Sequence, residues 1–473
     1  AERHRRATEL FREGLLQQAS ATLVQAPPVR VTDAIEQEMR LKHPAARHQE
    51  AERLAGLRVV AAAAAIHIDE DALEKALQGF SPASAGGPSG LRPQHIKEAM
   101  APGLRDEVRR HLAAIANRMA RGEVPSEVRA WLCGASLTAV PKPSGGHRPI
   151  AVGEAMRRLT AKALASTVAP AMRELFEPVQ LGVGTPGGAE ASVHVARQWM
   201  SRNAGDKDKV LVTIDVENAF NMIDRSAFLS DVRRTQPGLA PWVDFCYADA
   251  SHLLLDGRVL ASERGIQQGD PLGPALFALA VHTAILEARD AAQAEHPGGL
   301  DFCLFYLDDG TIAGSAVAVQ SFMRHFELKA RDRGLTLNTG KCEVIPSAGQ
   351  RTNVPEQTFP GWQWRRDGNF KLLGAPIGDV LFTEAHTDER RALAAELLKS
   401  VGKYDHCQGA LQLLRHCASW SRLVYSARTV PPELHETALD VFGQNLRGAL
   451  EQLTGDTLPE RSWLLAQLGI THG

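Results

Sequence analysis

The sequence predicts an α+β fold with helical ends and a central region of hairpins. Apolar residues recur at helical spacing over most of residues 1–75 and again from about residue 387 onward. Between these ends, short apolar runs alternate with Gly-containing turns, which is typical of β-hairpins. No internal repeat is visible, so one or a few conventional domains are expected.

Composition places the chain among ordinary globular proteins. It has 473 residues, 44% of them hydrophobic and 23% charged, and a formal net charge of −2. This length allows about two or three domains at roughly 150 residues each. A strongly basic total would have indicated a nucleic-acid partner, and this total does not. The basic segment with Arg105, Arg109, Arg110, Arg118 and Arg121 is therefore either a solvated helix face or a local binding patch.

Targeting and metal-framework signals are missing from the sequence. No apolar run reaches the roughly 18 residues that a membrane span needs, and the charged start AERHRRATELFREGL is unlike a signal peptide. The six cysteines are scattered without CxxC pairs, which predicts no zinc framework and a reducing compartment. We therefore expect an intracellular protein without a membrane partner, in the nucleus, an organelle or the cytoplasm.

The first half of the chain predicts mostly helices. Residues 1 to about 75 are rich in Ala, Arg and Glu, with a break at QAPPVR, and residues 81–93 (SPASAGGPSGLRP) form a loop. Residues 105–121 predict a helix because their apolar side chains share one face: Val108, Leu112, Ile115 and Met119. ASLTAVPKPSGGHRPIAV, residues 135–152, predicts a hairpin, and a long helix follows from Met156 to Met172.

The second half predicts the central strands. LVTIDV, residues 211–216, is a short buried strand that ends in an acid, and Asp256-Gly257 between apolar stretches is a strong hairpin signal. The remaining expected elements are a helix from Pro271 to about Ala294, a hairpin over residues 302–315, a helix over residues 316–333, a hairpin around Asp367-Gly368 and helices from about Thr387 onward.

Carboxylates stand at the ends of two apolar elements. Asp215 closes the strand 211–216, and Asp308 and Asp309 lie at the tip of the hairpin FCLFYLDDGTIAGS. Buried charge is costly unless it is neutralised. Mg²⁺ prefers oxygen ligands that it shares with substrate phosphates, and two such ions about 3.5–4 Å apart support phosphoryl transfer. A plainer interpretation also fits these acids, with Asp215 as a cap and Asp308-Asp309 as a surface turn.

Seven motifs, in order over about residues 80–380, resemble the reverse transcriptase family. They are GGPSGLRP, PKPSGGHRPIAV, IDVENAF (214–220), GIQQGDPLGP (265–274), YLDDG, GLTLNTGKCEV (334–344) and FKLLGAPIG (370–378). Each motif alone is only weakly specific for the family, whereas all seven motifs in order are strong evidence for the resemblance. The motif sequences are most similar to those of non-LTR retroelement and group II intron-like enzymes. They differ in that Leu307 and Gly273 replace the Ala and Ser that non-LTR enzymes commonly carry.

The resemblance implies a right-hand polymerase with a two-metal site. Asp215, Asp308 and the Val216 carbonyl would hold Mg²⁺, or Mn²⁺ in its place, with Asp309 alongside as a further catalytic acid. Lys341 would protonate the leaving pyrophosphate, although it also fits an exposed lysine after a turn.

The resemblance also implies the contacts of the incoming nucleotide. Lys142 and Arg148 would reach the triphosphate, Lys as a point charge and Arg as a planar fork. Phe220 would lie under the sugar and exclude a 2′-hydroxyl, and Gln268-Gly269 would let backbone approach nucleotide and template closely. The plainer alternatives are surface solvation for the cations, a core position for Phe220, and the start of the next helix for Gly269.

A domain division follows from the same resemblance. It places a helical N-terminal extension at residues 1–78, fingers with the start of the palm at 79–210, a palm with antiparallel sheet, helices and a primer-grip hairpin at 211–380, and a helical thumb at 381–473. Arg390, Arg391, Lys399 and Lys403 of the thumb either contact phosphates or form a solvated face. No endonuclease, RNase H or zinc-knuckle block is visible in these residues.

The sequence therefore predicts an RNA-directed DNA polymerase from a retroelement or a domesticated descendant. It would extend a DNA or RNA primer on an RNA template with dNTPs. Two other classes stay open: a catalytically silent scaffold or RNA-binding protein, and a related polymerase that uses ribonucleotides or no template. The intact acids argue against the first and Phe220 against the second, and the sequence identifies no protein partner.

Overall fold

The computed structural model describes residues 2–24, 30–57, 65–142, 145–404 and 406–466. The described chain combines many helices with two larger sheets and a two-stranded ladder, so the predicted α+β class is confirmed. It divides into two compact units. The larger unit contains residues 29–192 and 198–365, and the smaller unit contains residues 1–28, 193–197 and 366–473.

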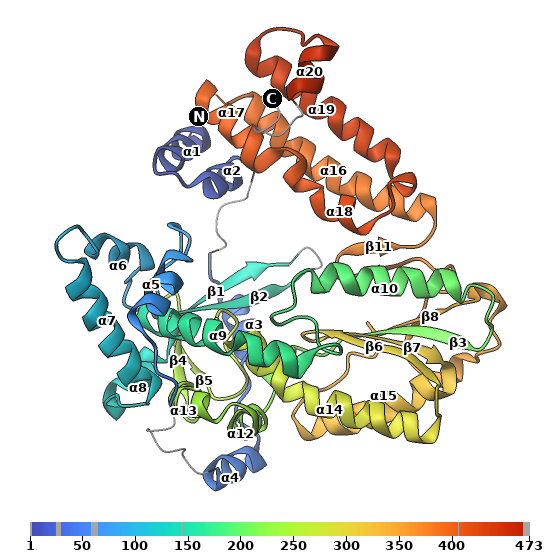
Figure 1. Ribbon diagram of the computed structural model, residues 1–473, viewed down its shortest axis with the longest axis horizontal. Coiled ribbons are helices and arrows are strands. Elements are labelled where there is room, and N and C mark those ends of the chain that lie inside the picture. The colour runs from blue at the N-terminus through green and yellow to red at the C-terminus, as the bar shows by residue number, and fades with distance from the viewer. Residues whose placement is uncertain (1, 25–29, 58–64, 143–144, 405, 467–473) are drawn as a thin grey trace. The chain divides into compact units, whose positions relative to one another are not determined.

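The centre of the larger unit is a five-stranded sheet. Its strands, in spatial order, are β6 (Leu300–Tyr306), β7 (Asp309–Ser315), β3 (Lys209–Ile214), β8 (Glu343–Pro346) and β9 (Gln363–Trp364). These runs are rich in β-branched and aromatic residues, which suit a pleated, half-buried surface. Helices α14 (Gly273–Glu295) and α15 (Ala316–Asp332) cover one face (Figure 1), where Phe322 and Phe326 are fully buried.

The register of this sheet brings two strand ends together. β3 pairs antiparallel with β7, and Ile214 lies opposite Gly310. β6 and β7 form the expected hairpin, whose two-residue turn consists of Leu307 and Asp308. Asp215 therefore leaves the sheet at the edge where the hairpin turns.

The larger unit also contains a separate four-stranded sheet. Its order is β2 (His147–Gly153), β1 (Ala135–Pro141), β4 (Ser251–Leu255) and β5 (Arg258–Ser262). The predicted hairpins β1–β2 and β4–β5 are confirmed. Asp256 and Gly257 have φ of 48° and 79°, the pair of positive angles that a type I′ turn requires. On this sheet lies α3 (Asp33–Lys42), whose Ile35 and Met39 join the core of the strands.

Helices surround the two sheets of the larger unit. They are α4 (His48–Gly56), α5 (Glu70–Gln78), α6 (Pro93–Ala99), α7 (Arg105–Ala120), α8 (Ser126–Leu132), α9 (Ala155–Phe176), α10 (Gly188–Arg202, which also enters the smaller unit), α11 (Ala219–Met222), α12 (Arg225–Thr235) and α13 (Ala240–Tyr247). The long helices expected at 105–121 and 156–172 are α7 and α9. No helix in the described ranges is long and apolar enough to cross a bilayer.

The basic segment of α7 is largely paired within the protein. Arg109 lies 3.1 Å from Glu74 of α5 and also contacts Asp71, and Arg105 contacts Glu74 as well. Arg121 contacts Glu123 at 2.8 Å. These pairs favour the solvated helix face over a nucleic-acid patch.

The smaller unit is built from both ends of the chain. It contains α1 (Glu2–Arg12), α2 (Leu16–Val24), β10 (Phe370–Leu372), β11 (Ala375–Ile377), α16 (Val380–Gly402), α17 (Cys407–Leu413), α18 (Val424–Thr429), α19 (Glu436–Thr454) and α20 (Glu460–Ala466). Its core joins Leu23 to Val401 and Phe442, and the Tyr404 hydroxyl donates to Thr8 Oγ1 at 2.7 Å. Residues 1–28 thus belong with the C-terminal helices, whereas residues 29–78 belong to the larger unit. The predicted break at QAPPVR falls almost wholly outside the described residues.

The hairpin predicted around Asp367-Gly368 is wrong. The strand before it, β9, pairs in parallel with β8, while the strand after it, β10, pairs with β11. The true turn is Leu373-Gly374, where φ of 47° and 81° again supplies a type I′ geometry. The Asp-Gly signal marks a local turn, but long-range pairing sends its flanking strands to different sheets.

Candidate active site

Three carboxylates predicted to be catalytic meet at one corner of the five-stranded sheet. Asp308 and Asp309 lie at the β6–β7 turn, and Asp215 follows β3. We name residues 306–309 the acidic turn. Leu307 has φ of 58°, a left-handed angle that branched side chains rarely adopt. Holding a non-glycine residue there costs on the order of 1–3 kcal/mol, and such strain persists only where the surroundings enforce it.

The three carboxylates repel one another. Burial raises the pKa of Asp308, the nearby Asp215 raises it further, and Arg148 opposes the rise. Burial raises the pKa of Asp309 to about 6, with additional repulsion from Asp308 and Asp215. Asp309 nevertheless reaches solvent. A site that disfavours its own charge in this way is suited to a bound cation.

The loop before β8 fixes the backbone of Asp215. The Asn338 N–H donates to the Asp215 carbonyl at 2.9 Å, and the Asp215 N–H donates to Cys342 Sγ at 3.4 Å. Lys341 lies in this loop with an exposed side chain. The carbonyl of the next residue, Val216, accepts no hydrogen bond from any described residue, which leaves its oxygen available to a ligand.

Four cations lie close enough to one another to interact, and one of them, Arg148, also acts on Asp308. Burial lowers the pKa of Lys142, and the positive charges of Lys42, Arg148 and Lys341 lower it further. We name these four residues the cation cluster. Lys142 and Arg148 flank the β1–β2 turn, where the Lys142 N–H donates to the Gly146 carbonyl at 2.9 Å. Mutual repulsion among four cations indicates a site for a polyanion.

Helix α3 ties the β1–β2 hairpin in place. The His147 N–H donates to Glu38 Oε1 at 2.8 Å, and His147 Nδ1 lies 2.7 Å from Glu38 Oε2. Burial alone would raise the pKa of Glu38, but hydrogen bonds from Lys42 and His147 outweigh burial and lower it to about 2. Asn218, in the segment after Asp215, donates to the Lys42 carbonyl at 2.8 Å. Sequence reasoning missed Glu38 and Lys42, which carry no motif.

The residues expected near the sugar and template lie on one loop and one short helix. The Phe220 ring is half-buried and stacks on Phe277 at 4.6 Å with an interplanar angle of 15°. Gly269 has φ of 136°, and a Cβ built on it would lie 2.2 Å from the Ala151 carbonyl oxygen of β2. The neighbouring Gln268 carbonyl accepts from the Ala151 N–H at 2.8 Å. The plainer alternative for Gly269, the start of a helix, is wrong because α14 begins at Gly273.

A buried polar network, also missed from sequence, supports this loop from below. Arg157 lies 3.2 Å from Asp270, contacts Gln267, and stacks over the Tyr247 ring at 5.4 Å. The Tyr247 hydroxyl donates to Asp270 at 2.6 Å. The Gln267 amide donates to the Cys133 carbonyl at 2.8 Å. Removing one partner would leave buried polar groups unpaired, so the network holds the loop rigidly.

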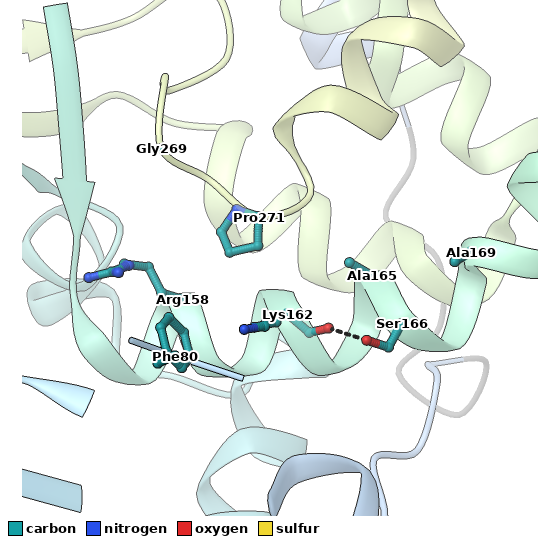
Figure 2. Close-up of a pocket in the computed structure, with 8 residues that line it drawn as sticks. All are labelled: Phe80, Arg158, Lys162, Ala165, Ser166, Ala169, Gly269 and Pro271. Carbon is teal, nitrogen blue, oxygen red and sulfur yellow. Dashed lines mark hydrogen bonds between the residues drawn. The ribbon is translucent and has the colours of Figure 1, made fainter. Parts of the chain in front are cut away.

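A cavity of about 490 Å³ opens beside the same loop. Figure 2 shows Arg158 and Lys162 extending from α9 near Phe80, with Gly269 and Pro271 on the other side. The Arg158 guanidinium lies 5.2 Å and Lys162 Nζ 4.5 Å from the Phe80 ring centroid. Neither cation forms an ion pair with a described residue. The cavity therefore offers two positive charges to a ligand, and these charges lie over the buried Phe80 ring.

The acidic corner fits a divalent cation whose remaining ligands come from the substrate. In the described part of the chain, no three His, Cys, Asp or Glu side chains form a ready metal cage. The available donors are carboxylate oxygens of Asp215 and Asp308 and the unbonded Val216 carbonyl. An all-oxygen, incomplete set of this kind matches Mg²⁺, which keeps waters and takes substrate phosphates as its other ligands.

A family comparison agrees with this geometry. The model of the family "Reverse transcriptase (RNA-dependent DNA polymerase)" matches residues 140–377, about half of the chain. The chain belongs to the reverse transcriptase family. The match covers Asp215, Asp308 and Asp309 and, within the cation cluster, every member except Lys42. The predicted right-hand polymerase fold of this reverse transcriptase is thereby confirmed.

Two relatives from retrotransposable elements are similar to this reverse transcriptase. The retrotransposable element SLACS 132 kDa protein of Trypanosoma brucei gambiense is 25% identical over 376 residues, which are 76% of the chain and 30% of that protein. The retrovirus-related Pol polyprotein from type-1 retrotransposable element R2 of Popillia japonica is 27% identical over 223 residues, 44% of the chain and 29% of the polyprotein. The chain spans less than a third of the length of these relatives. The predicted non-LTR style is confirmed.

Solved structures of telomerase also align with this reverse transcriptase. Apo telomerase from Candida tropicalis gives a TM-score of 0.41 at 10% identity and covers 71% of the chain and 64% of its own. Telomerase from Candida albicans, in complex with a TWJ fragment of telomeric RNA, gives 0.39 at 9% identity and covers 73% and 66%.

The basic residues expected on the thumb lie on and after α16, in the smaller unit. Arg390 donates to the Gly374 carbonyl at 2.8 Å, and Arg391 pairs with Asp388. Lys399 and Lys403 lie near the end of the same helix. Because Arg390 and Arg391 are engaged within the unit, Lys399 and Lys403 are the better candidates for phosphate contact.

Proposed function

We propose that this reverse transcriptase extends a DNA or RNA primer on an RNA template with deoxynucleotides. The observation that carries the proposal is the gathering of three carboxylates at one corner of the five-stranded sheet, where Arg148 of the cation cluster acts on Asp308. A nucleoside triphosphate with its metal ions complements both halves, because phosphates satisfy the cations and metal ions satisfy the acids.

Asp215, Asp308 and the Val216 carbonyl would hold Mg²⁺, with Mn²⁺ as a substitute and Asp309 alongside. A bound pair of ions would activate the attacking oxygen and stabilise the leaving one. The acidic turn and the segment after β3 contribute rigid placement of these oxygens, which is the main protein contribution to phosphoryl transfer.

The cation cluster would bind the triphosphate and assist the departure of pyrophosphate. Lys142 and Arg148 approach from the β1–β2 hairpin, and Lys341 approaches from the loop that holds Asp215. In the reaction, the primer 3′ oxygen bonds to the α-phosphorus, and the bond from that phosphorus to pyrophosphate breaks. The 3′-hydroxyl proton leaves to solvent, while Lys341 Nζ donates a proton to the pyrophosphate.

Sugar and template selection would fall to the neighbouring surfaces. Phe220 is held by its stack on Phe277, so its ring would form a stiff wall against a 2′-hydroxyl. The cavity with Phe80, Arg158 and Lys162 would take the template strand, because its two cations suit backbone phosphates. Gly269 between the two would allow the backbone to approach both.

The parts of the hand are assigned within the same proposal. Fingers and palm would lie in the larger unit, and the helices from α16 onward would form the thumb, with the β10–β11 hairpin as the primer grip. Residues 1–28 would support the thumb, so the N-terminal extension would serve two units. All six cysteines carry free thiols, which supports an intracellular, reducing location.

The deciding experiment is extension of a DNA primer on an RNA template, with dNTPs and NTPs in separate reactions. We expect dNTP incorporation that requires Mg²⁺ or Mn²⁺. Asp308→Ala and Asp215→Ala should each lose roughly a thousandfold or more in rate. Asp290→Ala is the matched control, because Asp290 pairs with Arg289 on the surface of α14.

Three results would contradict the proposal. Retention of more than a tenth of the rate in Asp308→Ala would remove the metal assignment. Binding of RNA without any extension by the wild type would indicate the silent scaffold. Equal use of NTPs and dNTPs would indicate the related ribonucleotide polymerase.

A further inference from the structure

A segment outside the recognised motifs runs along the free edge of β6. The Leu181 N–H donates to the Phe305 carbonyl at 2.7 Å, and the Phe305 N–H donates to the Val179 carbonyl at 2.7 Å. These bonds align residues 179–181 in parallel with the strand that leads into the acidic turn. They place the side chain between them, that of Gln180, directly against the turn.

The side-chain amide of Gln180 forms hydrogen bonds with both the N–H and the C=O of one residue in the acidic turn. The Leu307 N–H donates to Gln180 Oε1 at 2.8 Å, and Gln180 Nε2 donates to the Leu307 carbonyl at 3.0 Å. The Gly182 N–H donates to the same Oε1 at 3.0 Å. Gln180 is fully buried, so water does not compete for these bonds. Its side chain is therefore specific for the backbone of Leu307.

Gly182, two residues further along the same segment, also lies close against Leu307. A Cβ built on Gly182 would lie 2.6 Å from the Leu307 nitrogen, 2.9 Å from Leu307 Cγ and 3.0 Å from Gln180 Oε1. Only glycine lets this backbone approach the turn so closely. The two residues enclose the one position of the turn that has an unfavourable φ, the 58° of Leu307.

We propose that Gln180 is a positioning residue that holds Leu307 in its left-handed conformation and thereby sets the place of the Asp308 carboxylate. The inference rests on the proposed function in one respect, the catalytic role of Asp308. A left-handed non-glycine residue returns to ordinary backbone angles unless its surroundings prevent it. The Gln180 bonds to both the N–H and the C=O of Leu307 prevent that rotation, and the adjacent Asp308 follows the peptide that Gln180 holds.

The test is a double-mutant cycle between Gln180→Met and Leu307→Gly. Methionine keeps the length and burial of the side chain but makes neither bond. Glycine at position 307 adopts a positive φ without steric cost, so the turn no longer needs the restraint. Gln320→Met is the matched control, because Gln320 also donates its amide to a backbone carbonyl, that of Thr358 at 3.0 Å, far along α15.

Three readouts separate positioning from stability. Hydrogen exchange of the peptide spanning residues 300–315 reports opening of the turn. Mn²⁺ binding to the protein without nucleotide, followed by electron paramagnetic resonance, reports the carboxylate arrangement. Single-turnover extension at saturating nucleotide reports the rate, and a melting curve identifies any variant that is unfolded.

We expect Gln180→Met to slow single-turnover extension by roughly 10- to 100-fold, to weaken Mn²⁺ binding severalfold and to speed exchange in the 300–315 peptide. Gln320→Met should change none of these. Against the Leu307→Gly background, the same Gln180→Met change should cost less than about threefold. If Gln180→Met does not fold, Gly182→Ala displaces the turn instead by overlap with Leu307 and should show the same dependence on position 307.

Two outcomes would overturn the proposal. The first is wild-type exchange and Mn²⁺ binding in Gln180→Met. The second is a loss that is equally large with Leu307 and with glycine at position 307, because Gln180 would then act on something other than the strained turn. Exchange and Mn²⁺ binding need no polymerase activity, so they decide the inference even if the wild type extends no primer.

Discussion

Gly269→Ala tests the close approach between the loop after Ile266 and strand β2. An alanine Cβ at this position would lie 2.2 Å from the Ala151 carbonyl oxygen, far inside contact distance. Both partners are backbone, so no side-chain rotation relieves the overlap. The φ of 136° at Gly269 adds a second cost, because L residues rarely adopt it.

The expected magnitude follows from these two terms. The backbone angle costs about 1–3 kcal/mol for a residue with a Cβ, and overpacking adds about 1–3 kcal/mol. The loop can escape part of this cost by moving away from β2, but it then loses the bond from the Ala151 N–H to the Gln268 carbonyl, worth about 1 kcal/mol. A loop shift of about 1 Å near the nucleotide is expected to lower the extension rate by about 100-fold.

The assay compares urea unfolding and single-turnover extension in Gly269→Ala and in a control. Gly298→Ala is the matched control: its φ of 71° is also positive, but a Cβ there meets nothing within 4 Å. The control should lose stability only from its backbone angle and should extend primers normally. The difference between the two variants therefore reports the contact with Ala151 together with the less accessible φ of Gly269.

One result would refute this reasoning. If Gly269→Ala extends within about threefold of Gly298→Ala and unfolds at a similar urea concentration, the approach to Ala151 is not tight in solution. The glycine would then be dispensable, and the loop would owe its position to the Arg157–Asp270 network alone.

Other predictions concern the sugar, the hairpin, salt and pH. Phe220→Val should lower the preference for dGTP over GTP, measured as a ratio of kcat/KM, by about ten- to a hundredfold; an unchanged ratio would make Phe220 an ordinary core residue. Glu38→Gln should raise the KM for dNTP severalfold, because Lys42 and His147 lose their carboxylate partner; an unchanged KM would contradict this role. Affinity for an RNA–DNA duplex should fall with salt on a log–log slope of several units, and a flat response would argue against phosphate contacts. In the metal-free protein, the protonated form of Asp309 favours folding below about pH 4, and this contribution is lost as pH rises through about 6. Asp309→Asn should therefore stabilise the metal-free protein at pH 8, by at most about 1 kcal/mol since the side chain reaches solvent, and should have no such effect at pH 4; equal melting points at pH 8 would reject the shift.

Local chemistry explains which parts of the fold were predictable. The Asp256-Gly257 turn was predictable from its two residues alone, because both residues accept a positive φ. The hairpin with Asp308 was predictable from its apolar strands, and α7 and α9 from their helical periodicity. At Asp367-Gly368 the same local signal failed, since β9 finds a partner in β8 rather than in β10. Strand pairing is decided by distant segments that a local pattern does not contain.

The candidate site likewise contains some residues that were predictable from the sequence and others that were not. Asp215, Asp308 and Gly269 belong to motifs that a single sequence displays. Glu38 and Gln180 are lone polar residues without periodicity, and their partners lie 109 and 127 residues away in the chain. Their importance depends on what the fold places next to them, which in each case is the backbone of a functional turn.

Net charge was uninformative for a related reason. A formal charge of −2 averages 53 basic and 55 acidic residues, whereas the site depends on how a few of them are sorted. The fold collects carboxylates at the strand ends and cations on a hairpin, a loop and α3, and each group is unfavourable by itself: burial and repulsion raise the pKa of Asp309 and lower that of Lys142. Many other charges are paired, as between α5 and α7. Lys42 is balanced by Glu38, but the remaining cations and the three carboxylates are not ion-paired with described residues. This local sorting of charge, rather than the total, indicates a ligand that carries both phosphates and metal ions.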